Sequence, residues 1–405
     1  MKIEQSRASK AAIGLKDTKS TASKRVVAAF DFSQAKSRNP IKKCSKRPCL
    51  PSGGFSLLQV KVLFCALTIG LLMMVLPAQA SRKDVVVKIA SLPEQYDDVH
   101  VRNLSFSPDG SLIVVDSDGD KINVWDWRNR KIEKVLQRPK ASTSPKSAFQ
   151  FSEVRNQFIS CQDGKTAVRV WNISDWSIAS DVKSVIGNCQ GAKFSPDGAQ
   201  LLRLSDVPKK DGLIAYSTDS WSVTWGLQFP RFVPSALAVD FGGKFVAISG
   251  ITYVPPVGEA DPNKIYQQTK AAPTIIIVDL HERKIARTID ADAEGAIAWS
   301  PNGRRLAVAG RGYVEIFDAF DGQRLAHEKL KVSADMNVLY SPDGRLLIES
   351  DNNESGNSLG LNIWDADRKQ LQQHISGNFS SMDVSRDGTS LALGEKSKTT
   401  IWQFK

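Results

Sequence analysis

Apolar and polar residues follow one pattern that recurs seven times between Phe106 and Val384. Each copy consists of a short apolar strand, a tight polar turn and a second apolar strand. The turns use Pro, Asp or Asn, and Gly, residues that suit successive positions of a type I turn. The clearest copies are Phe106-Ser-Pro-Asp-Gly110, Phe194-Ser-Pro-Asp-Gly198, Trp299-Ser-Pro-Asn-Gly303 and Tyr340-Ser-Pro-Asp-Gly344, and the weaker ones are Phe151-Ser-Glu-Val-Arg155, Val239-Asp-Phe-Gly-Gly243 and Val384-Ser-Arg-Asp-Gly388.

The spacing of these copies predicts the fold. Their first residues are 45, 43, 45, 60, 41 and 44 positions apart, by subtraction of the residue numbers. A four-stranded propeller blade takes about 40–45 residues. We therefore expect an all-β protein, a seven-bladed β-propeller with four-stranded antiparallel blades. Many unrelated activities share such a ring, so the fold by itself leaves the function open.

The third strand of each repeat alternates apolar and polar residues, so one of its faces packs against the next blade. At the end of this strand the chain resembles the WD-repeat family, and the resemblance covers residues 84–405. No Gly-His pair opens any blade, so we expect the family's His–Asp–Trp hydrogen-bond network to be absent. The family's dipeptide stands at Trp125-Asp126 and Trp364-Asp365, with near forms at Trp171-Asn172, Phe317-Asp318 and Val278-Asp279 and departures at Tyr216-Ser217 and Trp402-Gln403.

The two ends of the repeat region predict how the ring closes. The seventh repeat supplies only three strands before the sequence reaches Lys405. Residues 84–90 read as a strand that precedes the first repeat and belongs to none. We expect this strand to complete the last blade, because pairing there removes two open sheet edges at once. Residues 81–405 would then form one domain.

An apolar segment before the repeats predicts export. Residues 62–76 form an uncharged apolar run of 15, and Ala78-Gln79-Ala80 follows Pro77. Signal peptides have an apolar core of about 7–15 residues and a small-x-small cleavage site, whereas a spanning helix needs about 20 residues. We expect residues 62–80 to be a signal segment cleaved between Ala80 and Ser81. The alternative is an uncleaved membrane anchor, with the propeller outside.

The net charge of +11 belongs to the leader. Residues 1–61 contain 14 of the 54 Lys and Arg and 3 of the 43 Asp and Glu, so the remainder holds 40 of each sign. A basic segment before an apolar one is expected on the cytoplasmic side. Because the propeller itself is neutral, the high isoelectric point does not indicate nucleic-acid binding. We interpret residues 1–61 as a solvated, disordered leader.

The cysteines divide between the leader and the propeller. Cys44, Cys49 and Cys65 precede the ring, which contains Cys161 and Cys189. Cys161 is expected to end the second strand of blade two, and Cys189 to begin the inner strand of blade three. These positions lie at the same end of neighbouring blades, so a disulfide can form in an oxidising compartment. Two free thiols are the alternative.

Chemistry-bearing motifs are scarce. The four histidines fall in different blades, and the sequence contains no phosphate loop or metal-ligand spacing. We therefore expect no cofactor, no metal and no catalytic residue. One alternative is a propeller enzyme, lactonase- or oxidoreductase-like, that acts on a small molecule at the channel mouth. His100 and Arg102 are expected at that mouth, and Lys146, Gln190 and Glu294 begin other inner strands.

The longest departure from the repeat is an insertion in blade four, residues 251–273, which explains the 60-residue interval. Long loops on a rigid scaffold often carry recognition, and Tyr and Pro suit stiff anchors. The alternative is a tolerated surface insertion. We expect an exported, monomeric, non-enzymatic scaffold that binds a protein partner in the cell envelope. It would touch membrane only through residues 62–76, if these stay uncleaved. A cell-wall polysaccharide binder is a further alternative. The expected contact residues are Tyr253, Pro255, Pro256, Tyr266, Arg102 and His100.

Overall fold

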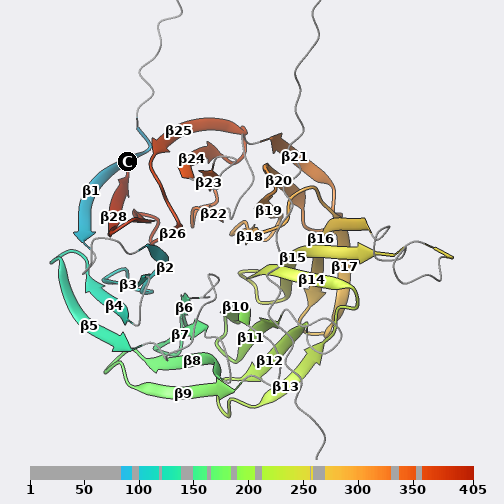
Figure 1. Cartoon of the computed structure of the whole chain (residues 1–405), viewed down its shortest axis with the longest axis horizontal. Helices are drawn as coiled ribbons and strands as arrows, with labels where there is room; N and C mark the ends of the chain where they lie inside the picture. Colours follow the sequence, from blue (N-terminus) through green and yellow to red (C-terminus); the bar gives the residue numbers. More distant parts are fainter. Residues whose placement is uncertain are drawn as a thin grey trace, which may run out of the picture. The chain divides into compact units, whose positions relative to one another are not determined.

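Seven four-stranded antiparallel sheets surround a central channel in the computed structural model of the chain (Figure 1). This architecture confirms the all-β, seven-bladed propeller. Among the described residues, no helix is long and apolar enough to cross a membrane. The structure describes residues 84–93, 100–117, 121–137, 149–161, 166–183, 189–205, 212–255, 257–258, 270–329, 337–352 and 358–405.

Each blade runs from an inner strand at the channel to an outer strand at the rim, and sequential strands are hydrogen-bonded neighbours. Blades one to three contain β2 (Val101–Phe106), β3 (Leu112–Ser117), β4 (Lys121–Asp126), β5 (Lys131–Gln137), β6 (Phe149–Phe151), β7 (Gln157–Cys161), β8 (Thr166–Asn172), β9 (Ile178–Lys183), β10 (Cys189–Phe194), β11 (Gln200–Ser205), β12 (Leu213–Ser217) and β13 (Val223–Leu227). Blades four to six contain β14 (Phe232–Val239), β15 (Phe245–Val254), β16 (Lys270–Asp279), β17 (Lys284–Asp290), β18 (Ala296–Trp299), β19 (Arg305–Gly310), β20 (Tyr313–Asp318), β21 (Arg324–Lys329), β22 (Val338–Tyr340), β23 (Leu346–Asn352), β24 (Ser358–Asp365) and β25 (Gln370–Ser376).

Blade seven is completed by the N-terminal strand, as the sequence predicts. β1 (Val86–Pro93) pairs antiparallel with β28 (Lys398–Phe404), outside β27 (Ser390–Glu395) and β26 (Ser381–Val384). The strand continues to Pro93, beyond the expected end at residue 90, because its partner β28 is long enough to pair that far. We call this pairing of β1 with β28 the seam.

The turn between the first two strands of a blade is stabilised by its own side chains. In blade one, the hydroxyl of Ser107 donates to a carboxylate oxygen of Asp109 at 2.5 Å and accepts from the Leu112 amide at 2.9 Å. Gly110 takes a φ of 67°, in the left-handed region that favours glycine. The same Ser–Asp hydroxyl bond is present at Ser195 and Ser341. This short-range chemistry explains why the motif recurs as a unit.

The hydrophobic core is divided into seven clusters, one between each pair of neighbouring blades. The cluster between blades seven and one combines Leu92 of β1 with Val101 and Trp125 of blade one and Ile401 of β28. Each blade therefore packs on its two neighbours, as in other repeat proteins.

Blade six contains a polar network in place of the family's His–Asp–Trp arrangement. Buried Glu349 accepts hydrogen bonds from the Asn362 amide at 2.6 Å and from the Trp364 indole at 3.2 Å. The Asn362 carbonyl oxygen lies 2.8 Å from Nδ1 of His374. The network thus joins β23, β24 and β25 through side-chain hydrogen bonds within one blade.

Candidate partner-binding site

The longest strands of the ring form an arm on blade four. β15 and β16 are ten residues each, whereas every other described strand has three to eight. Their pairing continues to Val254 opposite Lys270, and the hairpin extends beyond the ring (Figure 1). The structure thus differs from an insertion that is loop throughout, because residues 251–254 and 270–273 are strand. We call residues 251–258 and 270–273 the arm.

The root of the arm is held closely by β14. Ile251 and Thr252 pair with Val233 and Phe232, and the Tyr253 amide donates to the Arg231 carbonyl at 2.8 Å. At Gly250 a Cβ atom would lie 2.3 Å from the Val233 carbonyl oxygen, so only glycine fits. The arm therefore leaves the ring in a fixed direction.

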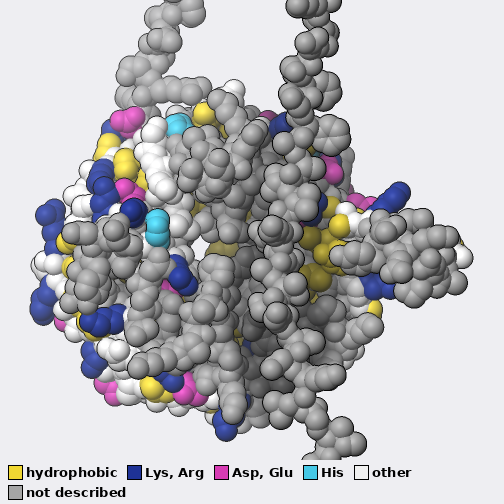
Figure 2. All heavy atoms as spheres, viewed as in Figure 1, with side chains coloured by type: hydrophobic (Ala, Val, Ile, Leu, Met, Phe, Trp, Pro, Cys, Tyr) yellow, Lys and Arg dark blue, Asp and Glu magenta, His cyan; other side chains and the backbone are white. Residues whose placement is uncertain are grey.

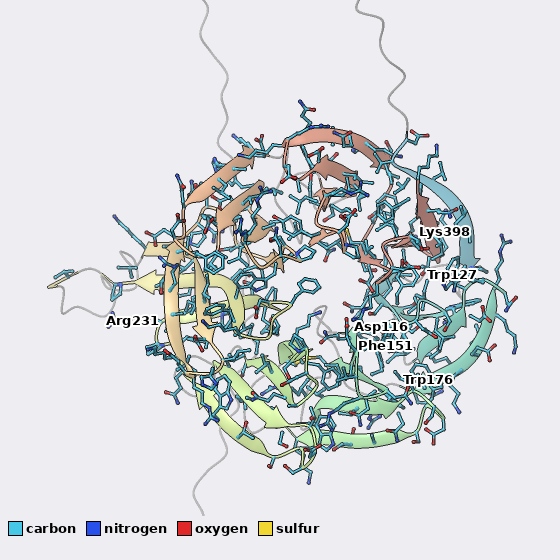
Figure 3. The ribbon with its side chains drawn as sticks, turned by 180° about the vertical axis from the view of Figure 1, so that it is seen from behind. Asp116, Trp127, Phe151, Trp176, Arg231 and Lys398 are labelled. Atoms are coloured by element: carbon cyan, nitrogen blue, oxygen red, sulfur yellow. A yellow bond between two sulfur atoms is a disulfide. The ribbon has the colours of Figure 1, made fainter. Side chains whose placement is uncertain are left out.

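The outer part of the arm exposes apolar side chains. Tyr253 is 39% exposed, Val254 is 49% exposed, and Val257 is fully exposed. Hydrophobic side chains also gather over β14 and β15 at the base of the arm (Figure 2). Of the other expected contact residues on the insertion, Pro255 is half-buried, and Pro256 and Tyr266 lie outside the described residues. Exposed apolar groups on a stiff hairpin are typical of a recognition element.

Four of the residues expected at the channel line the same cavity. The channel has a volume of about 1340 Å³ and is lined by His100, Arg102, Gln190 and Glu294, among others. Glu294 forms an ion pair with Arg311 at 2.6 Å, and His100 makes an isolated bridge with Lys396 of the neighbouring blade. Lys146, which the sequence placed with them, lies outside the described residues.

Two charged side chains of blades three and seven, Lys193 and Asp383, line the channel. Burial lowers the pKa of Lys193, and the Asp383 carboxylate opposes this shift. Burial also raises the pKa of Asp383. The Asp383 carboxylate accepts the Phe106 amide at 2.8 Å and the Ser105 hydroxyl at 3.2 Å, which fastens blade seven to blade one. Asp383 thus accepts hydrogen bonds from the innermost strand of the neighbouring blade.

The opposite mouth of the channel was not identified from the sequence. The third residue of the turn motif lines the channel in five blades, and Pro stands at this place in the clear copies. In the weaker copies Glu153, Phe241 and Arg386 stand there instead. Arg386 forms an ion pair with Glu153, which links blade seven to blade two past blade one. In the sequence, these channel residues could have been found from the departures from Ser-Pro-Asp-Gly at the three positions.

Cys161 and Cys189 lie where the sequence places them, at the end of β7 and the start of β10. The structure joins their sulfur atoms in a disulfide, with the Cα atoms 5.9 Å apart. That separation falls within the usual range for a disulfide. Whether the bond forms in the cell stays a prediction that depends on the compartment. The cleavage residues Ala78, Ala80 and Ser81 lie outside the described residues.

Comparisons with known proteins agree with the fold. The family described as WD domain, G-beta repeat, matches residues 88–126, which contain most of the seam strand and the first three strands of blade one. SEC12-like protein 1 of Arabidopsis thaliana is 24% identical over 170 residues, which are 41% of this chain and 42% of that protein. The match thus spans about two fifths of the relative's length. Together with the seven four-stranded blades, these matches identify the chain as a WD-repeat-like seven-bladed β-propeller.

Proposed function

We propose that this propeller is an exported scaffold that binds a protein partner in the cell envelope through the arm of blade four. Propellers of the WD-repeat type commonly serve as protein-interaction scaffolds. The arm supports this function most directly, because it exposes Tyr253, Val254 and Val257 on a hairpin that the ring does not need for closure. A stiff apolar element loses little conformational entropy on binding.

The export part of the proposal rests on two features. The apolar run at residues 62–76, followed by a small-x-small site, has the length of a signal-peptide core. Cys161 and Cys189 lie close enough for a disulfide, with Cα atoms 5.9 Å apart, and such a bond would persist in an oxidising compartment. A cell that retained the protein in a reducing compartment would keep these thiols free.

The test uses residues 81–405 as bait against an envelope extract, with retained proteins identified by mass spectrometry. In one variant a Gly-Ser link replaces residues 252–272 and joins Ile251 to Pro273, which are cross-strand partners. We expect a partner on the intact ring that the shortened ring does not retain. Equal retention by both forms would contradict binding through the arm.

A second pair of variants separates the arm from general surface stickiness. The first carries Tyr253→Ser, Val254→Ser and Val257→Ser. The matched control carries Ile178→Ser, Val223→Ser and Ile285→Ser on three outer strands, where the exposed fractions are 50%, 49% and 42%. We expect the arm variant to lose the partner and the rim variant to keep it. Equal loss from both would indicate non-specific hydrophobic capture.

A second candidate function is favoured by the channel. His100, Arg102, Gln190 and Glu294 all line the channel, whose volume is large enough for a small molecule, as a lactonase- or oxidoreductase-like enzyme would require. Turnover of lactone or redox substrates that is lost in Arg102→Ala and kept by the arm-shortened ring would favour this function. Polysaccharide binding has less support, because all nine tryptophans are buried or half-buried.

A further inference from the structure

Blades four and five bring three potential metal ligands together near the rim. Asp292 follows β17, while Glu315 of β20 and His327 of β21 are cross-strand partners. Nε2 of His327 lies 3.4 Å from Oδ2 of Asp292 and 4.0 Å from Oε1 of Glu315, and all three ligand atoms lie within 4.8 Å of one another. The residues are far apart in sequence, so only the fold assembles them.

These distances are close to those around a small divalent ion. Zn²⁺ binds carboxylate oxygen and imidazole nitrogen at about 2.0–2.2 Å, so two ligands of a tetrahedral site are roughly 3.4 Å apart. The histidine–aspartate distance already has this value, and the histidine–glutamate distance is only slightly longer. One nitrogen and two carboxylate oxygens are also a donor set that Zn²⁺ and its neighbours in the first transition series accept.

Two of the three side chains are held in place before any ion binds. Glu315 is fully buried, and its Oε2 accepts the amides of Asp292 and Ala293, each at 2.7 Å. Its other oxygen, Oε1, faces the cluster and accepts no hydrogen bond from the described residues. The His327 ring stacks on Tyr313 with the ring centres 4.7 Å apart. Such outer contacts orient ligands at known metal sites.

Arg324 currently neutralises part of the cluster. Its Nη1 donates to Asp292 Oδ2 at 2.9 Å, and its Nε lies 3.0 Å from Glu315 Oε1, in an orientation that makes an ion pair without a hydrogen bond. One guanidinium faces two carboxylates, so one negative charge remains. The arginine side chain is 37% exposed, and its guanidinium carbon lies 5.7 Å from the centre of the Phe317 ring. An ion and the guanidinium would contact the same two oxygens, so each excludes the other.

We propose that Asp292, Glu315 and His327 bind a divalent transition-metal ion of the Zn²⁺ class, with Arg324 displaced into solvent and a fourth position left for water. The ion links the segment after the outer strand of blade four to blade five. It therefore fastens the blade that carries the arm to its neighbour. This site is independent of the proposed partner binding.

The test is calorimetric titration of Zn²⁺ into the full chain, purified with its free thiols alkylated so that the leader cysteines do not compete. We expect one saturable site per chain. His327→Ala should weaken binding at least about tenfold, because loss of an outer contact alone costs that much at known sites. Arg324→Met should tighten it by roughly threefold or more, because the ion no longer displaces exposed ion pairs.

His281→Ala is the matched control, because His281 is an exposed histidine on the same blade pair, next to Asp279 but outside the cluster. The affinity of the His281→Ala variant for Zn²⁺ should equal that of the wild type. Circular dichroism checks that each variant is folded. The proposal is overturned if the wild type shows no saturable site, if His327→Ala and His281→Ala bind alike, or if Arg324→Met binds more weakly than the wild type.

Discussion

The seam of blade seven and the arm of blade four are both additions to the regular repeat, and they differ in what surrounds them. At the seam, Val86 and Leu92 are 1% and 0% exposed and pack in the clusters on either side of blade seven. On the arm, the side chains of Tyr253, Val254 and Val257 are exposed to solvent. The seam adds buried area to the ring, while the arm adds accessible apolar surface.

This difference separates a structural addition from a functional one. Closure of a ring removes open sheet edges, so the seam contributes to the stability of every neighbouring blade. The part of the hairpin that extends past the ring contributes mainly its own four residue pairs, from Ile251 opposite Pro273 to Val254 opposite Lys270. Variants of the seam should therefore lower the stability of the fold more than variants of the arm do. Variants of the arm should lose partner binding.

The largest expected effect is at the buried end of the seam strand. Leu92→Ala should lower the free energy of unfolding by about 2–5 kcal/mol, because it leaves a cavity between blades seven and one. Ile89→Ala, on the same strand and 41% exposed, is the matched control and should cost about 0.5 kcal/mol or less. Urea unfolding measures both, and equal costs would show that the seam strand is not packed as described.

A second effect concerns the contact of blade seven with blade one. A Cβ atom at Gly394 would lie 2.3 Å from the Ser381 hydroxyl and 2.6 Å from a methyl group of Val101. Gly394→Ala should therefore cost about 1–3 kcal/mol through overpacking. Gly226→Ala, where the nearest atom is 3.6 Å away, should be close to neutral. Thermal unfolding of the two variants measures both costs. A neutral Gly394→Ala would mean that the two blades separate easily.

The turn of blade seven predicts a pH dependence. Partial burial acts to raise the pKa of Asp387, but hydrogen bonds from Ser385 and Thr389 outweigh it and hold the pKa below its usual value. A lowered pKa stabilises the fold above the unfolded value of about 4 and loses this contribution as the pH falls through the folded value. Asp387→Asn should cost about 1 kcal/mol or less at neutral pH.

The cost of Asp387→Asn should disappear in acid, below the folded pKa of the wild-type carboxyl. Unfolding curves of both proteins at several pH values measure the difference. A cost that stays constant from neutral to acid pH would show that the carboxylate charge is not what stabilises the turn.

The smallest expected effect on stability is that of the arm itself. The ring in which a Gly-Ser link replaces residues 252–272 should unfold within about 0.5 kcal/mol of the wild type, because the described residues in this range belong to none of the seven core clusters. The same variant is expected to lose its partner. A cost as large as that of Leu92→Ala would make the arm part of the fold.

Much of the ring could be predicted from the sequence because its signals are local. The turn chemistry around Ser107 and Asp109 and the period-two alternation of β4 lie within a few residues of each other. The end of β1 was missed by three residues, because only its pairing with β28 sets its length. Residues 251–254 and 270–273 were expected as loop, since prolines and polar residues around them obscure a strand that β14 helps to form.

The clusters that combine distant residues could not be predicted. Glu153 and Arg386 meet across the channel mouth from blades two and seven, and Asp292 meets His327 from blades four and five. Their positions depend on the angle between blades, which no short motif encodes. By contrast, the meeting of Cys161 and Cys189 was foreseen, because both positions follow from the strand order of adjacent blades.

The most direct test of the central claim is site-specific photo-crosslinking in living cells that make the full chain. A benzoylphenylalanine probe replaces Val257 on the arm or, as the control, Val223 on the rim, which is 49% exposed. We expect a discrete crosslinked partner from position 257 and none from position 223. Crosslinks from position 223 alone, or from neither position under conditions in which the intact ring retains a partner, would contradict binding through the arm.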